Sequence, residues 1–212
     1  MADYIIVSYY TAETYYEESA KTLLNSLKKF NIPHDIQSVP NLGSWQKNTC
    51  YKPVFLKKMM GKHYPKSIIW VDCDAEFVKY PKLFEELECN IAAHLFKIEK
   101  GIKQPDGTYG TQLASGTVFL KNIPKTYQIL LDWEKECRDN PNVLDQKSLE
   151  NVLKGYFYNL PGEYCKIFDR MAYITDPVII HWQHSRIAHK FKTLKLQEAE
   201  ILIEKQKNRI IT

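Results

Sequence analysis

The sequence has neither a long apolar run nor a closely spaced pair of cysteines. No stretch approaches the ~20 apolar residues that a membrane-spanning helix needs, and the first residues lack the basic start and apolar core of a signal peptide. The five cysteines form no Cys-x-x-Cys pair, which argues against a disulfide framework and against a structural zinc site. We therefore expect reduced thiols and a cytoplasmic protein.

Glycine is also scarce, with eight in 212 residues. None lies in Val7–Thr11, where a sugar-phosphate nucleotidyltransferase would carry its phosphate-binding loop, so that class is excluded. The net charge of +4 is too small to indicate a nucleic-acid partner. Hydrophobic residues at 44% and charged residues at 25% are typical of a globular chain, and we find no repeat, low-complexity block or linker. A single domain over residues 1–212 is expected.

The most informative segment is Ser67–Asp74, in which the apolar run Ile68–Val71 ends in two aspartates. A short apolar run of this kind is typical of a buried strand. Asp72 and Asp74 are two residues apart, so both carboxylates would point to the same side at the carboxyl end of the strand. Ligands of open α/β sheets bind at that end, and two adjacent carboxylates favour a divalent cation beside a phosphate.

Hydrophobic periodicity predicts a β-α-β-α-β opening, and hence a mostly parallel central sheet covered by helices. The expected elements are a strand over 4–9, a helix over 13–30, a strand over 34–39, a helix over 53–60 stopped by Gly61, and the strand before Asp72. Further on we expect strands over 90–96, 114–120, 157–160 and 178–182, and helices beginning at Pro124 and Asp145. Residues 100–110 should form a turn or mobile loop, and residues 186–212 a charged helical tail.

Several segments, taken together in order, carry a family resemblance. They are Trp45, Lys52-Pro-Val-Phe55, Asp72-Cys-Asp74, Ser115-Gly-Thr-Val-Phe-Leu120, Asp145-Gln146 and Ile180-His181. This arrangement resembles nucleotide-sugar glycosyltransferases of the GT-A fold, in particular glycosyltransferase family 8. The resemblance covers residues 4 to about 190. It implies a single GT-A domain with a Rossmann-like sheet, a small antiparallel element, and transfer of a sugar from a nucleotide donor, with UDP as the expected nucleotide, to a hydroxyl acceptor.

The resemblance also implies roles for individual residues. Asp72, Asp74 and His181 would bind Mn²⁺ or Mg²⁺, and His181 tilts the choice towards manganese. Donor-binding residues would be Ser8, Tyr9, Tyr10, Lys52, Asp72, Ser115, Gly116, Arg186 and Lys190. The family pattern that follows the late histidine is replaced here by His-Trp-Gln-His-Ser-Arg, which leaves open whether Arg186 or Lys190 grips the leaving diphosphate.

The stereochemistry is left open by the residues alone. A retaining mechanism, implied by the resemblance, would place Asp145 and Gln146 nearest the anomeric carbon. An inverting mechanism needs a carboxylate base, for which Asp145, Glu163 and Asp169 are candidates. Asp145 has a second interpretation as a helix N-cap.

Two alternative functions of the chain are compatible with parts of its sequence. A haloacid-dehalogenase-type phosphatase also uses Asp-x-Asp, but its later adjacent acidic pair on a strand end is missing, since Glu85-Glu86 lies in a helix-like stretch. A catalytically degenerate glycan- or nucleotide-binding module would look similar to an active enzyme. The expected acceptor is a glycan, a lipid-linked group or a protein, and the basic, amphipathic tail at 186–212 could contact an anionic membrane surface.

Overall fold

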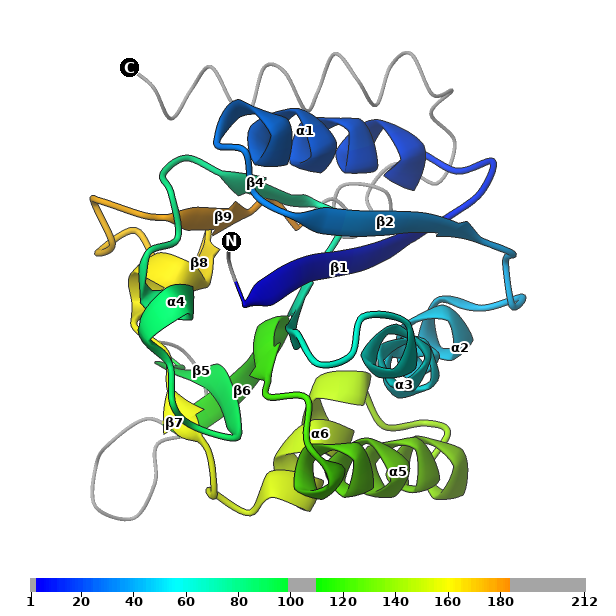
Figure 1. The fold of residues 1–212 in the computed structure, drawn as a ribbon. Coiled ribbons are helices and arrows are strands. Elements are labelled where there is room, and N and C mark those ends of the chain that lie inside the picture. Colours follow the sequence, from blue (N-terminus) through cyan, green and yellow to red (C-terminus); the bar gives the residue numbers. More distant parts are fainter. Residues whose placement is uncertain (1–2, 99–109, 184–212) are drawn as a thin grey trace.

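The computed structural model describes residues 3–98 and 110–183, which form a six-stranded sheet, a second small sheet, six α-helices and the short 3-10 helix η1 (Gly162–Tyr164) (Figure 1). The order of the large sheet is β2-β1-β3-β6-β5-β7. Its strands are β1 (Tyr4–Thr11), β2 (His34–Val39), β3 (Ser67–Val71), β5 (Ile91–Lys97), β6 (Thr111–Leu120) and β7 (Tyr158–Asn159). Strand β1 runs parallel to β2 and β3, and β7 runs parallel to β5, whereas β6 is antiparallel to both of its neighbours. The predicted α/β class with a mostly parallel sheet is confirmed.

Helices cover both faces of the large sheet, as Figure 1 shows. On one face lie α3 (Lys52–Lys62), α5 (Pro124–Asp139) and α6 (Asp145–Leu153), and the short α2 (Trp45–Cys50) precedes α3. On the other face lies α1 (Tyr16–Lys29), and α4 (Leu83–Glu86) follows β4. The prediction that Gly61 stops a helix is wrong, since α3 continues to Lys62.

The small sheet packs beside α1 and holds β4 (Ala75–Phe77), β9 (Ile179–His181) and β8 (Lys166–Ile167) in the order β4-β9-β8. Strand β9 is antiparallel to β4 and parallel to β8. Because β4 follows β3 after a three-residue turn, this pairing carries His181 to the carboxyl end of β3. Ala75 lies directly opposite His181, so the late histidine and the two aspartates come together although over 100 positions separate them.

A bulge in β6 decides which way the central side chains point. Ala93 of β5 pairs with Val118, but its neighbour His94 pairs with Ala114, so residues 115–117 have no partner on β5. Leu113 and Val118 both pack in the core against α3, α5 and α6, although five positions apart in a regular strand would place them on opposite faces. The strand therefore turns over within the bulge, and Ser115 and Thr117 project to opposite faces of the sheet.

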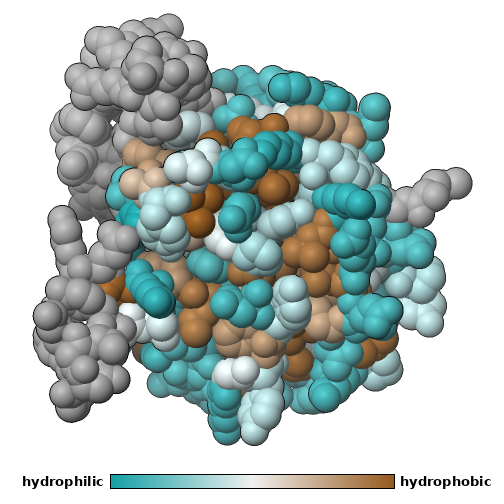
Figure 2. Space-filling model, turned by 90° about the vertical axis from the view of Figure 1, so that its left-hand side faces the viewer, coloured by the Kyte–Doolittle hydropathy of each residue, from teal (hydrophilic) through white to brown (hydrophobic). Residues whose placement is uncertain are grey.

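The surface in Figure 2 mixes hydrophobic and hydrophilic side chains in adjoining patches. A folded protein ordinarily exposes much apolar area, so this mixture needs no partner to explain it. Within residues 3–98 and 110–183, none of the helices combines the length and the apolar character that crossing a bilayer requires.

Candidate active site

A cavity of about 570 Å³ opens where β1 and β3 end, and residues from α2, α6 and the β6 bulge complete its walls. It brings together most of the described residues that the sequence marks as functional: Tyr9, Tyr10, Lys52, Asp72, Asp74, Ser115, Gly116, Asp145, Gln146 and His181 all line it. The expected position at the carboxyl ends of parallel strands is thus where the cavity lies.

Asp72 is held from two sides at the end of β3. Its backbone N–H donates to the carbonyl of Gly116 (2.8 Å), which fixes the main chain against β6. Its Oδ1 accepts hydrogen bonds from the Trp70 indole (2.8 Å) and the Lys52 ammonium (3.1 Å). The other oxygen, Oδ2, lies near Gly116, since a Cβ on that glycine would be 3.3 Å from it. Oδ2 is thereby left as the Asp72 atom that faces His181.

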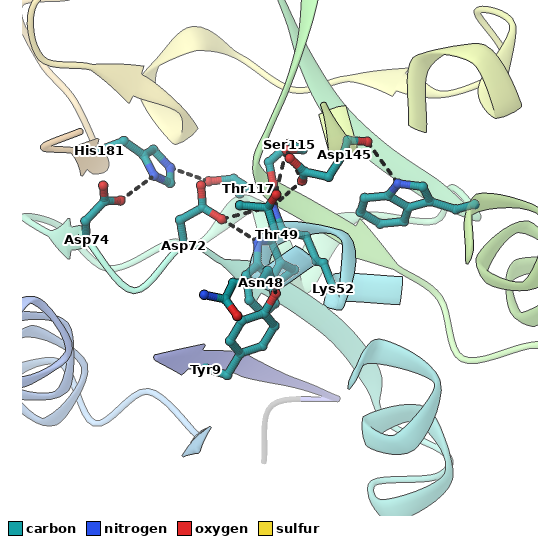
Figure 3. Close-up of polar contacts among 12 residues, drawn as sticks. Tyr9, Asn48, Thr49, Lys52, Asp72, Asp74, Ser115, Thr117, Asp145 and His181 are labelled. Carbon is teal, nitrogen blue, oxygen red and sulfur yellow. Dashed lines mark hydrogen bonds and ion pairs between the residues drawn. The ribbon is translucent and has the colours of Figure 1, made fainter. Parts of the chain in front are cut away.

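His181 is buried, with 1% of its surface exposed, and it is oriented by Thr117. Its Nε2 lies 2.8 Å from the Thr117 hydroxyl, and its Nδ1 lies 4.0 Å from Oδ1 of Asp74 (Figure 3). Burial lowers the pKa of His181 to about 4, although the nearby Asp72 carboxylate opposes this shift. The imidazole is therefore neutral at pH 7, and Nδ1 has no hydrogen-bond partner among the described residues.

The donor set of these three side chains suits a divalent cation. Asp72, Asp74 and His181 each offer one ligand atom, and the three atoms lie within 4.8 Å of one another. Gly116 leaves room beside them, because a Cβ there would come within 2.9 Å of the His181 ring. Two carboxylates and a neutral imidazole with an unpartnered nitrogen are ligands that manganese accepts, and the carboxylates suit magnesium as well.

Lys52 lies at the start of α3 and is almost completely buried, with 3% of its surface exposed. Its ammonium contacts Asp145 (2.8 Å) and Asp72 (3.1 Å), and it lies 5.0 Å from the centre of the Trp70 ring (Figure 3). The two carboxylates raise the pKa of Lys52 despite the opposing effect of burial. The ammonium is thus occupied by protein carboxylates, and its contact with a diphosphate stays a prediction.

Asp145 begins α6, but the interpretation of this residue as an N-cap is wrong. The cap position belongs to Leu144, and no side chain caps the helix. The Asp145 carboxylate turns instead into the cavity, where Oδ2 contacts Lys52 and accepts a hydrogen bond from the Ser115 hydroxyl (3.1 Å). Its main-chain carbonyl accepts from the Trp133 indole (2.9 Å), which fixes the start of the helix. The other candidate bases, Glu163 and Asp169, do not line the cavity.

The residues expected to hold a nucleobase are placed differently from one another. Ser8 is fully buried and is not among the cavity residues. Tyr9 reaches the cavity but packs its ring against Phe55 and Trp70, and its hydroxyl donates to the carbonyl of Asn48 (2.5 Å). Only Tyr10 of these three is half-exposed at the cavity. The Tyr9 ring is therefore part of the packing beneath the cavity.

Sequence reasoning missed several side chains that the fold places at the site. Tyr16 lines the cavity next to Trp45, an exposed residue that also lines it. The Trp70 indole holds Asp72, and Thr117 holds His181. Trp45 is one of the segments that carry the family resemblance, but the sequence alone predicts no role for it. A polar residue within the apolar run 117–120 is the signal that could have singled out Thr117.

Arg186, Lys190, most of the loop predicted at 100–110 and the tail at 186–212 lie outside the described residues. Their roles in diphosphate binding and membrane contact stay predictions.

Comparisons with known proteins show which fold this is. No protein-family model matches the chain, and no curated protein matches its sequence. Solved structures do match: a glycosyltransferase involved in glycosylation of the major capsid of PBCV-1 superposes with a TM-score of 0.61 at 13% identity, covering 94% of this chain and 98% of that one. The glycosyltransferase GlyE of Streptococcus pneumoniae TIGR4 matches with a TM-score of 0.56 at 14% identity over 99% of this chain, and its apo form gives 0.54. The chain spans 64% of the length of GlyE. This protein therefore has a fold that is shared with solved glycosyltransferases.

Proposed function

We propose that this protein is a metal-dependent glycosyltransferase that moves a sugar from a UDP-linked donor to a hydroxyl acceptor. One observation carries the proposal: Asp72, Asp74 and His181 converge in one cavity of a fold shared with glycosyltransferases. These side chains come from two different sheets, so their meeting is a product of the whole fold.

Asp72, Asp74 and His181 would hold the cation, with Oδ2 of Asp72 and Nδ1 of His181 as the ligand atoms that face each other across Gly116. Bound manganese or magnesium would neutralise the charge that develops on the departing diphosphate. Trp70 and Lys52 contribute by fixing Oδ1 of Asp72, so that the carboxylate cannot rotate out of the site. Preorganisation of this kind lowers the cost of binding.

The nucleotide would lie at the end of the cavity formed by β1 and α2. Tyr10, Tyr16 and Trp45 offer aromatic faces there, and stacking on a base is an effective use of such surfaces. We therefore assign the role first expected of Ser8 and Tyr9 to aromatic side chains that are more exposed at the cavity. Ser115 and Gly116 would lie beside the donor sugar, and Gly116 permits close approach because it has no side chain.

Asp145 and Gln146 would face the reacting carbon. Of the three candidate bases, Asp145 is the one that lines the cavity, and its carboxylate lies 2.8 Å from the Lys52 ammonium. We propose that transfer retains the anomeric configuration, as the Asp-Gln pair suggests. NMR of the first product formed would report its anomer, and a product inverted relative to the donor would rule out retention.

The test is a screen of UDP- and GDP-sugars for hydrolysis or transfer in the presence and absence of Mn²⁺. Asp74→Ala should abolish the metal-dependent turnover while circular dichroism shows an intact fold. Asp132→Ala, on the exposed side of α5, removes the same group far from the cavity and should behave as the wild type. Nucleotide-sugar binding with no turnover for any donor would favour the degenerate binding module. Equal turnover by Asp74→Ala and the wild type would refute the metal role.

A further inference from the structure

Thr117 is completely buried and contacts His181 on the side of its ring that faces away from the proposed metal site. The β6 bulge turns its side chain towards the small sheet, where its hydroxyl meets Nε2 of His181 at 2.8 Å. Because Nε2 points to Thr117, Nδ1 of the same ring points to the gap between Asp72 and Asp74 (Figure 3). The position of Thr117 thus determines which ring nitrogen faces the carboxylates.

A neutral imidazole carries one proton, either on Nδ1 or on Nε2, and only the bare nitrogen can bind a metal. Two carboxylates beside Nδ1 attract a proton to that nitrogen, and a proton there would block a metal ligand. A hydrogen-bond acceptor at Nε2 opposes this by stabilising the tautomer with its proton on Nε2. The Thr117 hydroxyl oxygen is placed to be that acceptor.

A second contact leaves the Thr117 oxygen available. The buried thiol of Cys165 lies beside Thr117, and the hydroxyl and main-chain N–H of Thr117 partly offset the rise in the pKa of Cys165 that burial causes. The Thr117 hydrogen can therefore be donated to the Cys165 sulfur, while the oxygen accepts from Nε2–H of His181. The main-chain N–H is available for this contact because the bulge leaves Thr117 without a partner on β5.

We propose that Thr117 is a positioning residue that keeps the proton of His181 on Nε2 and so presents the Nδ1 lone pair to the cation. Thr117 does not itself touch substrate or metal. This inference rests on the proposed metal site, and it adds to it a chain of three buried groups, His181, Thr117 and Cys165, that spans β9, β6 and the segment before β8.

The first test measures Mn²⁺ binding in the absence of nucleotide, by the EPR signal of free Mn²⁺ during titration. Thr117→Val keeps the shape of the side chain and removes the hydroxyl, and we expect a loss in affinity of about 10- to 100-fold, as for other groups that orient a ligating histidine. Thr117→Ser restores a hydroxyl and should recover most of the affinity. Thr126→Val is the matched control: Thr126 is as buried and its hydroxyl donates to the carbonyl of Asn90 (3.3 Å), away from the cavity.

The second test needs no metal. Long-range ¹⁵N–¹H NMR of the wild type distinguishes the two tautomers, and the His181 signals are assigned by their absence in His181→Gln. We expect the proton on Nε2 in the wild type, and a shift towards Nδ1–H in Thr117→Val.

The outcomes separate the two proposals. Wild-type Mn²⁺ affinity in Thr117→Val, or a wild-type spectrum with the proton on Nδ1, would overturn the role of Thr117 and leave the metal site standing. No Mn²⁺ binding by the wild type would overturn the metal site and this inference with it. A loss in Thr117→Val that Thr126→Val reproduces would show a general effect of removing a buried hydroxyl, and would also overturn it.

Discussion

Replacing Gly116 with alanine adds one methyl group at the centre of the proposed site. The new Cβ would lie 2.9 Å from Cε1 and 3.0 Å from Nδ1 of His181, and 3.3 Å from Oδ2 of Asp72. Carbon atoms in contact normally lie about 3.5–4.0 Å apart, so the His181 ring would have to retreat by about 0.5 Å or more. The ring is buried and held by Thr117, so it has little freedom to do so.

Two effects of different size are expected for Gly116→Ala. Overpacking a buried site costs about 1–3 kcal/mol of folding stability. Displacing a metal ligand by half an ångström exceeds the tolerance of a preorganised site, and a loss of Mn²⁺ affinity of at least tenfold should follow. The backbone of Gly116 is not in the left-handed region, so alanine introduces no conformational strain of its own.

The assay pairs an EPR titration with Mn²⁺ and a chemical denaturation series on the same protein. Gly61→Ala serves as the control, because a Cβ on Gly61 meets nothing within 4 Å. That helical substitution should leave Mn²⁺ binding unchanged and stabilise the fold by about 0.5–1 kcal/mol. If Gly116→Ala binds Mn²⁺ as tightly as the wild type and unfolds at the same denaturant concentration, the geometry argued for the site is wrong.

Three further predictions follow from the same contacts. The pKa of His181 near 4 lies below the pKa of a histidine in the unfolded chain, so the free energy of unfolding falls as the pH drops below about 6.5. Between pH 7 and pH 4 the metal-free wild type should lose about 3 kcal/mol more stability than His181→Gln, measured by urea unfolding. Parallel pH profiles for the two proteins would contradict this. Lys52→Met leaves the buried Asp145 carboxylate without its cation and should cost about 3–5 kcal/mol in the same assay, whereas a loss under 1 kcal/mol would show that the ion pair is not structural. Trp45→Ala should weaken UDP binding by about 1–3 kcal/mol in calorimetry if a base stacks on that ring, and an unchanged affinity would place the base elsewhere.

Local patterns were sufficient to predict most elements of the fold. Residues 34–39 form β2 as expected, and apolar runs marked β3, β5 and β6 to within a few residues. The Asp72–Asp74 spacing also placed both carboxylates at one cavity, because a strand end is a local feature. The prediction that Gly61 ends the helix was wrong because a helix packed against a sheet tolerates a glycine that would destabilise an isolated helix.

The features that could not be predicted depend on contacts between distant segments. The Asp145 carboxylate leaves the helix end because Lys52 and Ser115, far away in sequence, offer stronger partners than a free N–H. Thr117 and Ser115 have the same parity in the sequence and would share a face of a regular strand. Because of the bulge, Thr117 contacts His181 whereas Ser115 contacts Asp145. The bulge arises from pairing between β5 and β6 that no local pattern encodes.

The most direct measurement is the crystal structure of the protein soaked with Mn²⁺ and UDP, with anomalous diffraction recorded for the metal. We expect a manganese peak within coordination distance of Asp72, Asp74 and Nδ1 of His181, with the diphosphate on its open side. An anomalous peak elsewhere, with both aspartates turned away from the nucleotide, would rule out the proposed metal site.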